Sequence, residues 1–248
     1  MIASTTAPNT GARRTSYEQG YVRALFDSIA PRYDFLNHVL SFGLDFYWRA
    51  SAIRRLRPFR PVSVLDIATG TADFAVRVAR LGAASVVGMD ISPAMLHIGK
   101  RRIARAGVAE IVSLREGAAE SLPFTSSAFD AATVVFGVRN FSDLDAGIRE
   151  AFRVIRPGGI LLVMEFSRPT TEPFGTIFGF YFRQILPRVG GLISRNREAY
   201  TYLPRTVSEF PDGSAFGGLL ERHGFRDIGI HSLTLGVASI YIAHKPVS

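Results

Sequence analysis

Short apolar runs alternate with segments of helical periodicity over the central part of the chain. The run from Val62 to Leu65 favours a strand, and apolar residues then recur at helical spacing at Phe74, Val78 and Leu81. The same alternation predicts strand 62–67, helix 72–81, strand 85–90, helix 93–106, strand 110–115, strand 131–136, helix 143–155 and strand 160–166. Alternation at this spacing predicts an α/β fold with a parallel sheet and right-handed crossovers.

The segment before this core is helical. Residues 17–40 show helical faces that are interrupted at Pro31, and residues 42–56 read as a further helix that carries Trp48. Residues 1–16 are polar, and we expect them to be disordered or loosely attached.

The alternation stops after the last predicted core strand. Residues 174–189 form an amphipathic pattern that is rich in aromatic residues. Helices are then predicted at 198–210 and 213–223, and an antiparallel pair of edge strands at 225–231 and 235–243. We therefore expect an N-terminal arm and helical cap over residues 1–60. The α/β domain would span 61–248, with a helical insertion at about 168–211.

The charge is concentrated outside the core. The chain carries 27 Arg and 2 Lys, with a net charge of +8. Residues 1–60 hold nine Arg against four acids, and residues 168–205 hold six Arg against two. Such a surface attracts either nucleic acid or an anionic bilayer. There is no cysteine and no apolar run long enough to cross a membrane, and we expect a cytoplasmic protein without a signal peptide.

A tight turn joins the first core strand to the first core helix. The strand ends in Asp66, and the small residues Ala68, Thr69, Gly70 and Thr71 follow. At the carboxyl edge of an open α/β sheet, such a turn brings backbone N–H groups close to a nucleotide-like ligand.

The second strand ends in Asp90, twenty residues after Gly70, where an acidic side chain binds ribose hydroxyls in doubly wound folds. Capping of the next helix is the alternative role, although Ser92 is the better N-cap. The dinucleotide pattern G-x-G-x-x-G is absent, and Asp73 at the helix start would repel a pyrophosphate. Together with Asp66, this carboxylate favours a cationic ligand, S-adenosylmethionine.

Several spaced motifs resemble the quinone-biosynthesis C-methyltransferases of the menaquinone and ubiquinone branch. The family's first signature resembles the stretch Tyr33-Asp34-Phe35-Leu36-Asn37 together with Leu40-Ser41 and Trp48. The family's second signature resembles Arg153-Val154-Ile155-Arg156-Pro157-Gly158-Gly159 together with Glu165-Phe166-Ser167. Further similar stretches are Phe136-Gly137-Val138-Arg139-Asn140, Glu120-Ser121-Leu122-Pro123-Phe124 and Leu186-Pro187-Arg188. The resemblance covers nearly the whole chain from about Phe26.

This resemblance implies a class I S-adenosylmethionine-dependent methyltransferase. The fold is then Rossmann-like, with a mostly parallel seven-stranded sheet, an antiparallel last strand and an N-terminal helical cap. The cofactor-binding residues it implies, together with those expected from the strand ends, are Asp66, Ala68, Gly70, Thr71, Asp90, Ile91, Met95, Ala118 and Ala119. Met95 could instead belong to the core.

The chain departs from the family pattern at a few positions. Asp45 stands where the family often has His, and Ala118 replaces a polar residue near the adenine. Ala68 and Ala72 stand where the broader methyltransferase class has Gly.

The implied reaction transfers a methyl group to a ring carbon of a quinol, beside a phenolic hydroxyl that must ionise. Arg139 is expected to stabilise the phenolate or position a water, and Asn140 to bind a quinol oxygen. The alternative for Arg139 is an ion pair with Asp143 or Asp145. Tyr33 is a further candidate catalytic residue, with simple packing as its alternative. The five His show no metal-ligand spacing, so no metal site is expected.

A polyprenylated quinol stays in the bilayer, so we expect peripheral contact between the enzyme and the membrane surface. Helix 174–189 could provide it, or could form a dimer interface in a homo-oligomer or pack in the core. Demethylmenaquinol is the favoured substrate because Val135 occupies a place where the dual-substrate branch often has Ser. A ubiquinone-pathway benzoquinol is the runner-up. An RNA methyltransferase and a non-catalytic subunit remain alternatives, but no base-stacking motif follows the fourth strand, and we expect no nucleic-acid partner.

Overall fold

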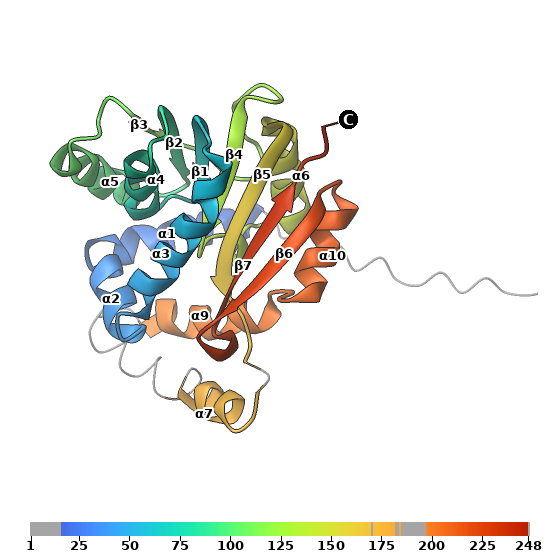
Figure 1. The fold of residues 1–248 in the computed structure, drawn as a ribbon. Coiled ribbons are helices and arrows are strands. Elements are labelled where there is room, and N and C mark those ends of the chain that lie inside the picture. Colours follow the sequence, from blue (N-terminus) through green and yellow to red (C-terminus); the bar gives the residue numbers. More distant parts are fainter. Residues whose placement is uncertain (1–15, 170, 182–183, 185–196, 248) are drawn as a thin grey trace, which may run out of the picture.

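A seven-stranded sheet forms the centre of the protein (Figure 1). The computed structural model describes residues 16–169, 171–181, 184 and 197–247. The strand order is β3-β2-β1-β4-β5-β7-β6, and β7 runs antiparallel to both of its neighbours. The strands are β1 (Ser63–Ile67), β2 (Ser85–Asp90), β3 (Val112–Glu116), β4 (Phe129–Val135), β5 (Ile155–Phe166), β6 (Arg226–Leu233) and β7 (Ala238–His244). The predicted fold, including the antiparallel last strand, is confirmed.

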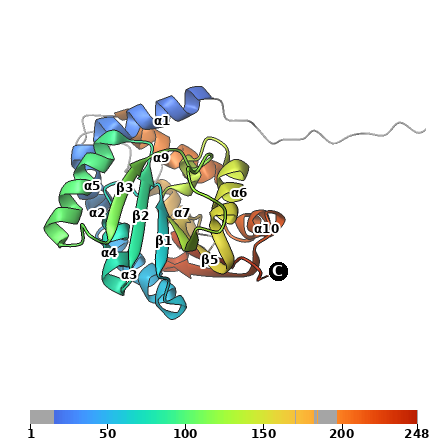
Figure 2. The ribbon, with the colours of Figure 1, turned by 90° about the horizontal axis from the view of Figure 1, so that it is seen from above.

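Helices cover both faces of the sheet, and the two layers can be followed in Figure 2. One face packs against α3 (Leu44–Leu56), α4 (Asp73–Leu81) and α5 (Pro93–Ala106). The other face packs against α6 (Leu144–Val154) and α10 (Ser214–Arg222). The central strands β1 and β4 are buried on both faces, which explains why their sequences are mainly apolar rather than alternating.

A third apolar cluster lies beyond the carboxyl ends of the parallel strands, where Figure 1 shows α1, α2 and α9. Its members come from the cap, from Met95 of α5 and from Tyr202 and Val207 of α9. The elements that form this layer are α1 (Ser16–Ile29), η1 (Ala30–Arg32), α2 (Tyr33–Leu40) and α9 (Arg197–Glu209). The cap therefore covers the edge of the sheet at which the predicted loop and Asp90 are found.

Two segments differ from the prediction in instructive ways. β5 begins at Ile155 rather than at residue 160, because Gly158 N–H and Lys245 N–H form hydrogen bonds that pair residues 158–159 with the end of β7. Of the predicted helix 174–189, the structure describes α7 (Phe174–Phe180) and two residues beyond it, and the remainder lies outside the described residues. Residues 1–15 of the start that was expected to be loose (1–16) also lie outside them, and α1 begins at Ser16. Within the described part of the chain, every helix is too short or too polar to cross a membrane.

Candidate active site

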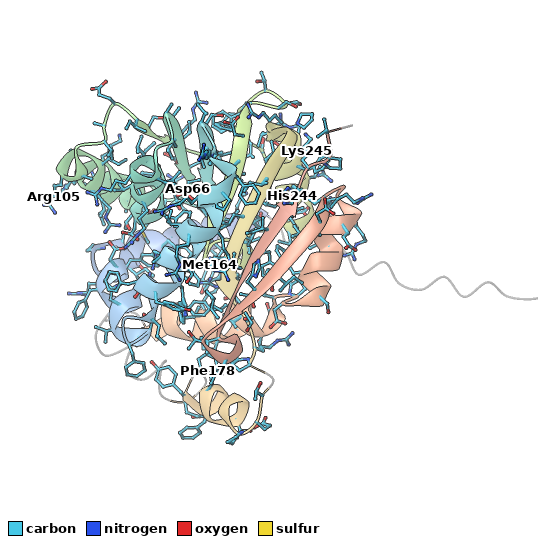
Figure 3. The ribbon with its side chains drawn as sticks, in the orientation of Figure 1. Asp66, Arg105, Met164, Phe178, His244 and Lys245 are labelled. Atoms are coloured by element: carbon cyan, nitrogen blue, oxygen red, sulfur yellow. The ribbon has the colours of Figure 1, made fainter. Side chains whose placement is uncertain are left out.

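The loop after β1 is held by the Asp66 carboxylate, which lies inside the sheet (Figure 3). The hydroxyls of Thr69 and Thr133 each donate a hydrogen bond to this carboxylate at 2.6 Å. Burial raises the pKa of Asp66 to about 6, against the effect of these two donors. Asp66 therefore fixes the start of the loop and joins β1 to β4.

Three residues of this loop have left-handed backbone conformations: Ala68 (φ 55°), Gly70 (φ 56°) and Ala72 (φ 60°). Only Gly adopts this region without a steric penalty, so Ala68 and Ala72 store strain. The tight turn brings the loop backbone to the end of β2. There Asp90 accepts a hydrogen bond from Gly70 N–H at 2.8 Å.

Asp90 is bound by backbone N–H groups and faces a cavity. Besides Gly70, Ser92 N–H donates to its carboxylate at 2.9 Å, and burial raises the pKa of Asp90 to about 6. The N-cap of α5 is Ser92, whose hydroxyl accepts a hydrogen bond from Met95 N–H at 3.1 Å. The alternative capping role of Asp90 is therefore wrong, and this carboxylate is available to a ligand.

A small cavity of about 70 Å³ lies between this loop and the cap. Its lining includes most of the predicted cofactor residues, namely Ala68, Gly70, Asp90, Ile91, Met95 and Ala119. Asp66, Thr71 and Ala118 are not part of this lining. Met95 both lines the cavity and belongs to the apolar cluster beneath the cap, so its two expected roles are compatible.

A larger, mainly apolar cavity of about 400 Å³ adjoins the small one. The two cavities share three aromatic lining residues, Phe26, Tyr33 and Phe136. Phe178 of α7, labelled in Figure 3, lines the larger cavity at the end of the molecule where the parallel strands terminate. The polar lining residues of the larger cavity are Tyr33, Asn37, Ser41, Asp45, Arg49, Arg139, Tyr181, Tyr202 and Thr234.

The Arg139 guanidinium enters the larger cavity from η3 (Val138–Asn140). It forms a buried ion pair with Glu165 and donates a hydrogen bond to Phe136 O at 2.9 Å. Glu165 is 0% exposed; burial raises the pKa of this carboxyl, and the nearby Arg139 opposes that increase. Sequence reasoning assigned Glu165 no role, although Glu165 and Arg139 lie at the ends of adjacent strands.

The partners proposed from sequence for an Arg139 ion pair are wrong. Asp143 caps α6 by accepting a hydrogen bond from Ala146 N–H at 2.9 Å. Asp145 lies 2.7 Å from His223 Nε2. Both acids point to the helix layer, so the guanidinium stays in the cavity.

Tyr33 and Asn140 lie near the junction of the two cavities. Burial raises the pKa of the Tyr33 hydroxyl, and the charges of Arg139 and Arg49 oppose this increase. Asn140 lines the small cavity, and among the described residues its Oδ1 atom is buried without a hydrogen-bond donor. A buried acceptor of this kind is costly unless a ligand supplies the donor. The structure thus brings the three predicted catalytic residues together.

Two carboxylates of the cap hold it against the loops, and sequence reasoning missed both contacts. Asp27 accepts hydrogen bonds from the Ser92 hydroxyl at 2.5 Å and from Ala94 N–H at 3.2 Å. Asp34 accepts a hydrogen bond from the Thr71 hydroxyl at 2.8 Å. Thr71 therefore connects the loop to the cap instead of lining the cavity.

Comparison with known proteins agrees with this geometry. The sequence model of the ubiE/COQ5 methyltransferase family matches residues 14–245. The demethylmenaquinone methyltransferase of Bacteroides fragilis is 40% identical over 238 residues, 96% of this chain and 95% of the relative. That of Deinococcus radiodurans is 42% identical over 226 residues, covering 90% and 92%. The ubiquinone/menaquinone biosynthesis C-methyltransferase UbiE of Geotalea daltonii is 40% identical, covering 90% and 96%.

Solved structures support the fold. An S-adenosylmethionine-dependent methyltransferase from Thermotoga maritima has a TM-score of 0.65 at 19% identity, with 90% of this chain and 99% of that chain covered. The phosphoethanolamine N-methyltransferase 2 of Haemonchus contortus, bound to S-adenosyl-L-methionine, has a TM-score of 0.57 at 16% identity, covering 79% and 52%. The protein is an S-adenosylmethionine-dependent C-methyltransferase of quinone biosynthesis, and the chain belongs to the ubiE/COQ5 methyltransferase family.

Proposed function

We propose that this protein methylates a ring carbon of polyprenylated demethylmenaquinol and so produces menaquinol. The observation that carries the proposal is the pair of adjoining cavities, one beside Asp90 and one large and apolar, with three shared aromatic residues. The small cavity marks where the loop would hold a methyl donor, and the large one has the volume and apolar lining that suit a flat aromatic ring with an apolar tail. A methyl acceptor in the large cavity would meet the donor at Phe26, Tyr33 and Phe136.

The residues of the small cavity fit S-adenosylmethionine. Its ribose hydroxyls are donors that the Asp90 carboxylate can accept, while Ile91, Met95 and Ala119 offer apolar surface for the adenine. When bound, this donor supplies a methyl group on a positively charged sulfur. The carboxylates of Asp66 and Asp90 place negative charge near the loop, which favours a cationic donor over a phosphate-bearing one.

Arg139 would stabilise the phenolate form of the quinol. Its high pKa makes it a poor proton acceptor, but a fixed guanidinium in a dry cavity favours a developing negative charge. Glu165 and Phe136 O hold the guanidinium from behind, so little reorganisation is needed when the substrate ionises. The Tyr33 hydroxyl, which lines both cavities, would orient a quinol oxygen, and Asn140 Oδ1 would accept a hydrogen bond from a quinol hydroxyl that reaches the small cavity.

The substrate assignment to a naphthoquinol is supported by the relatives from Bacteroides fragilis and Deinococcus radiodurans, which are named demethylmenaquinone methyltransferases. The relative from Geotalea daltonii is named for both pathways. A ubiquinone-pathway benzoquinol is therefore the second candidate.

We also propose that the enzyme takes its substrate from a membrane surface that it contacts peripherally from the cytoplasm. Phe42 is 77% exposed, yet it lines the large cavity. Exposed apolar side chains continue along α2, α3 and the end of α7, namely Phe35, Val39, Phe46, Tyr47 and Phe180. A polyprenyl tail that leaves the cavity past Phe42 would pass directly into lipid beneath this surface.

Liposome flotation tests the membrane contact. We expect Phe42→Ser to reduce binding to vesicles that contain anionic lipid. Phe59→Ser removes a partly exposed aromatic residue before the amino end of β1 and should leave binding unchanged. Wild-type protein that stays with the unbound fraction, even in low salt, would refute this contact.

Product analysis tests the substrate. Purified protein is incubated with S-adenosylmethionine carrying a labelled methyl group and with demethylmenaquinol or its benzoquinol counterpart, each in detergent. Label in menaquinol is expected, at a higher rate than label in the benzoquinol product. Label found only in the benzoquinol would transfer the assignment to the second candidate, and label in neither would overturn both.

A further inference from the structure

A polar cluster surrounds Asp45 at the start of α3, in the lining of the large cavity. Its Oδ2 atom lies 2.6 Å from His38 Nδ1 and accepts a hydrogen bond from Arg49 Nη1, also at 2.6 Å. The Ser41 hydroxyl lies 3.0 Å from Asp45 Oδ1. Asp45 is 2% exposed, so this carboxylate is bound almost entirely by protein groups.

The cluster connects the large cavity to solvent. Ser41, Asp45 and Arg49 line the cavity, and among the described lining residues Asp45 is the single carboxylic acid. His38 does not line the cavity, and its side chain is 34% exposed. The ring of Phe46 stacks on the imidazole at a centroid distance of 4.2 Å and fixes its orientation toward Asp45. The chain of contacts therefore runs from the cavity, through Asp45, to an imidazole in contact with water.

The charged groups around Asp45 share their contacts with other elements of the protein. Arg49 is shared, because its Nε atom lies 3.2 Å from Asp73 of α4, which also contacts Arg77 at 3.0 Å. Further ionisable groups near the cluster include Tyr33, which interacts electrostatically with Arg49, Asp34 on α2, which binds Arg102, and Tyr181, whose hydroxyl donates to Leu40 O. Arg49 thus faces two carboxylates, those of Asp45 and Asp73.

The proposed reaction requires a route for one proton. Methylation replaces a ring C–H bond by a C–C bond, and the sulfonium of the donor becomes a neutral thioether, so one proton is released in each turnover. The phenolic O–H bond breaks first, and the ring hydrogen later moves to that oxygen as the ring regains aromaticity. In a mainly apolar cavity the released proton needs a fixed acceptor, and Arg139 is already protonated.

We infer that Asp45 and His38 form the proton exit of the quinol cavity, an inference that rests on the proposed C-methylation. Asp45 accepts the proton of a quinol hydroxyl, and His38 takes it from Asp45 and releases a proton to water. His38 is a positioning residue in this scheme, because it acts on the substrate through Asp45. Arg139 then stabilises the phenolate that remains.

A purely structural role would leave a different signature. Ser41 and Asp45 also shape the turn between α2 and α3, since Asp45 N–H donates to the Ser41 hydroxyl at 3.3 Å. Loss of that turn would lower the unfolding temperature and the affinity for both substrates. Loss of the proton exit would lower kcat while KM and cofactor affinity stay near their wild-type values.

The test compares His38→Ala and His38→Gln with His223→Gln. His223 also contacts a carboxylate, Asp145 at 2.7 Å, but on the far side of the sheet from this cluster, so its replacement controls for loss of a His–carboxylate pair. We expect both His38 variants to lose about 100-fold in kcat, the lower end of the range for a lost proton-transfer group. Added imidazole should restore much of the rate of His38→Ala, whereas His223→Gln should behave as wild type.

Each outcome decides the inference. Wild-type kcat in both His38 variants would overturn it, as would a loss that imidazole does not restore and that parallels a lower unfolding temperature. If the wild-type protein methylates no quinol, the proposed function fails and the inference fails with it. If the wild type and both His38 variants methylate the quinol at the same rate, the proposed function stands and only this inference is overturned.

Discussion

Asp34 of the cap and Thr71 of the loop after β1 are joined by a 2.8 Å hydrogen bond, although they lie 37 residues apart in the chain. Arg102 of α5 contacts both residues, donating to the Thr71 hydroxyl at 2.8 Å and to Asp34 at 2.5 Å. The loop that faces the small cavity is thus tied to the helix that covers it. Closure of the cap and the conformation of the loop are therefore expected to be coupled.

Replacing Asp34 by Ala should weaken the binding of S-adenosylmethionine. The change removes two charge-assisted hydrogen bonds, from Thr71 and Arg102, at a partly exposed position, and their combined loss is worth about 1–2 kcal/mol. The expected loss of affinity is about 5- to 30-fold. Isothermal titration calorimetry measures it, with Asp145→Ala as a control that removes a carboxylate contact with His223 in the α6 layer. Equal affinities for the two variants would contradict the coupling.

Replacing Glu165 in addition to Arg139 should restore the stability of the protein but not its turnover. Arg139→Met leaves Glu165 buried without its cation, which is expected to lower the free energy of unfolding by about 3–5 kcal/mol. Adding Glu165→Gln should restore most of that stability. The double variant should still lose about 100- to 1000-fold in kcat, because the group that stabilises the phenolate is gone.

Urea denaturation, calorimetry with S-adenosylmethionine and turnover assays separate these effects. Cofactor affinity should stay near the wild-type value in the double variant. A double variant that turns over normally would show that Arg139 serves only to neutralise Glu165.

The local pattern of apolar and polar residues was sufficient to predict most of the fold. Apolar runs predicted the core strands to within a few residues, and Ser92 was correctly preferred over Asp90 as the N-cap of α5. These features can be recognised in a short stretch of sequence. Burial on both faces makes a strand mainly apolar, and a cap acts on the N–H groups of the next turn. The same reasoning led to Asp90, Gly70 and Arg139, since strand ends meet at one edge of the sheet.

The contacts made by the cap could not be predicted from the local sequence pattern. The pairing of Asp34 with Thr71, and of His38 with Asp45, depends on how α2 packs on the loop and on α3, which periodicity does not encode. The prediction placed residues 156–159 between helix 143–155 and strand 160–166, whereas pairing with the end of β7 extends β5 through them. Long-range packing therefore decides the features that short-range propensity leaves open.

Affinity for S-adenosylmethionine should fall as the pH is lowered from 7 to 5. Burial raises the pKa of Asp90 to about 6, and ribose hydroxyls donate to the ionised carboxylate. S-adenosylmethionine thus binds to the form in which Asp90 is ionised. Below the raised pKa, protonation of Asp90 in the free protein competes with this binding. At one unit below that pKa about a tenth of the carboxyl groups are ionised, so affinity should drop about tenfold.

Calorimetry at pH 5, 6 and 7 measures this dependence. Asp90→Asn should bind more weakly at pH 7 and vary less between pH 5 and 7, because its amide does not titrate. The same pH dependence in wild type and Asp90→Asn would assign the titration to another group, with Asp66, whose pKa is also about 6, as the first candidate.

Substitutions at Gly137 and Ala68 should have strongly coupled effects on the free energy of unfolding. A Cβ atom at Gly137 would lie 2.5 Å from the Ala68 Cβ atom, while its other neighbours are at 3.5 Å or more. Gly137→Ala is therefore expected to destabilise the protein by about 1–3 kcal/mol. Ala68→Gly removes the obstructing atom and relieves the left-handed backbone of Ala68 (φ 55°), so it should rescue Gly137→Ala.

Urea denaturation of the ligand-free protein gives the four free energies of this double-mutant cycle. Gly70→Ala is the matched control: its backbone is also left-handed (φ 56°), but a Cβ atom there has no neighbour within 4 Å among the described residues. Its destabilisation comes from backbone strain alone, so Ala68→Gly should not rescue it. Additive effects at Ala68 and Gly137 would show instead that the loop moves aside to accept the new methyl group.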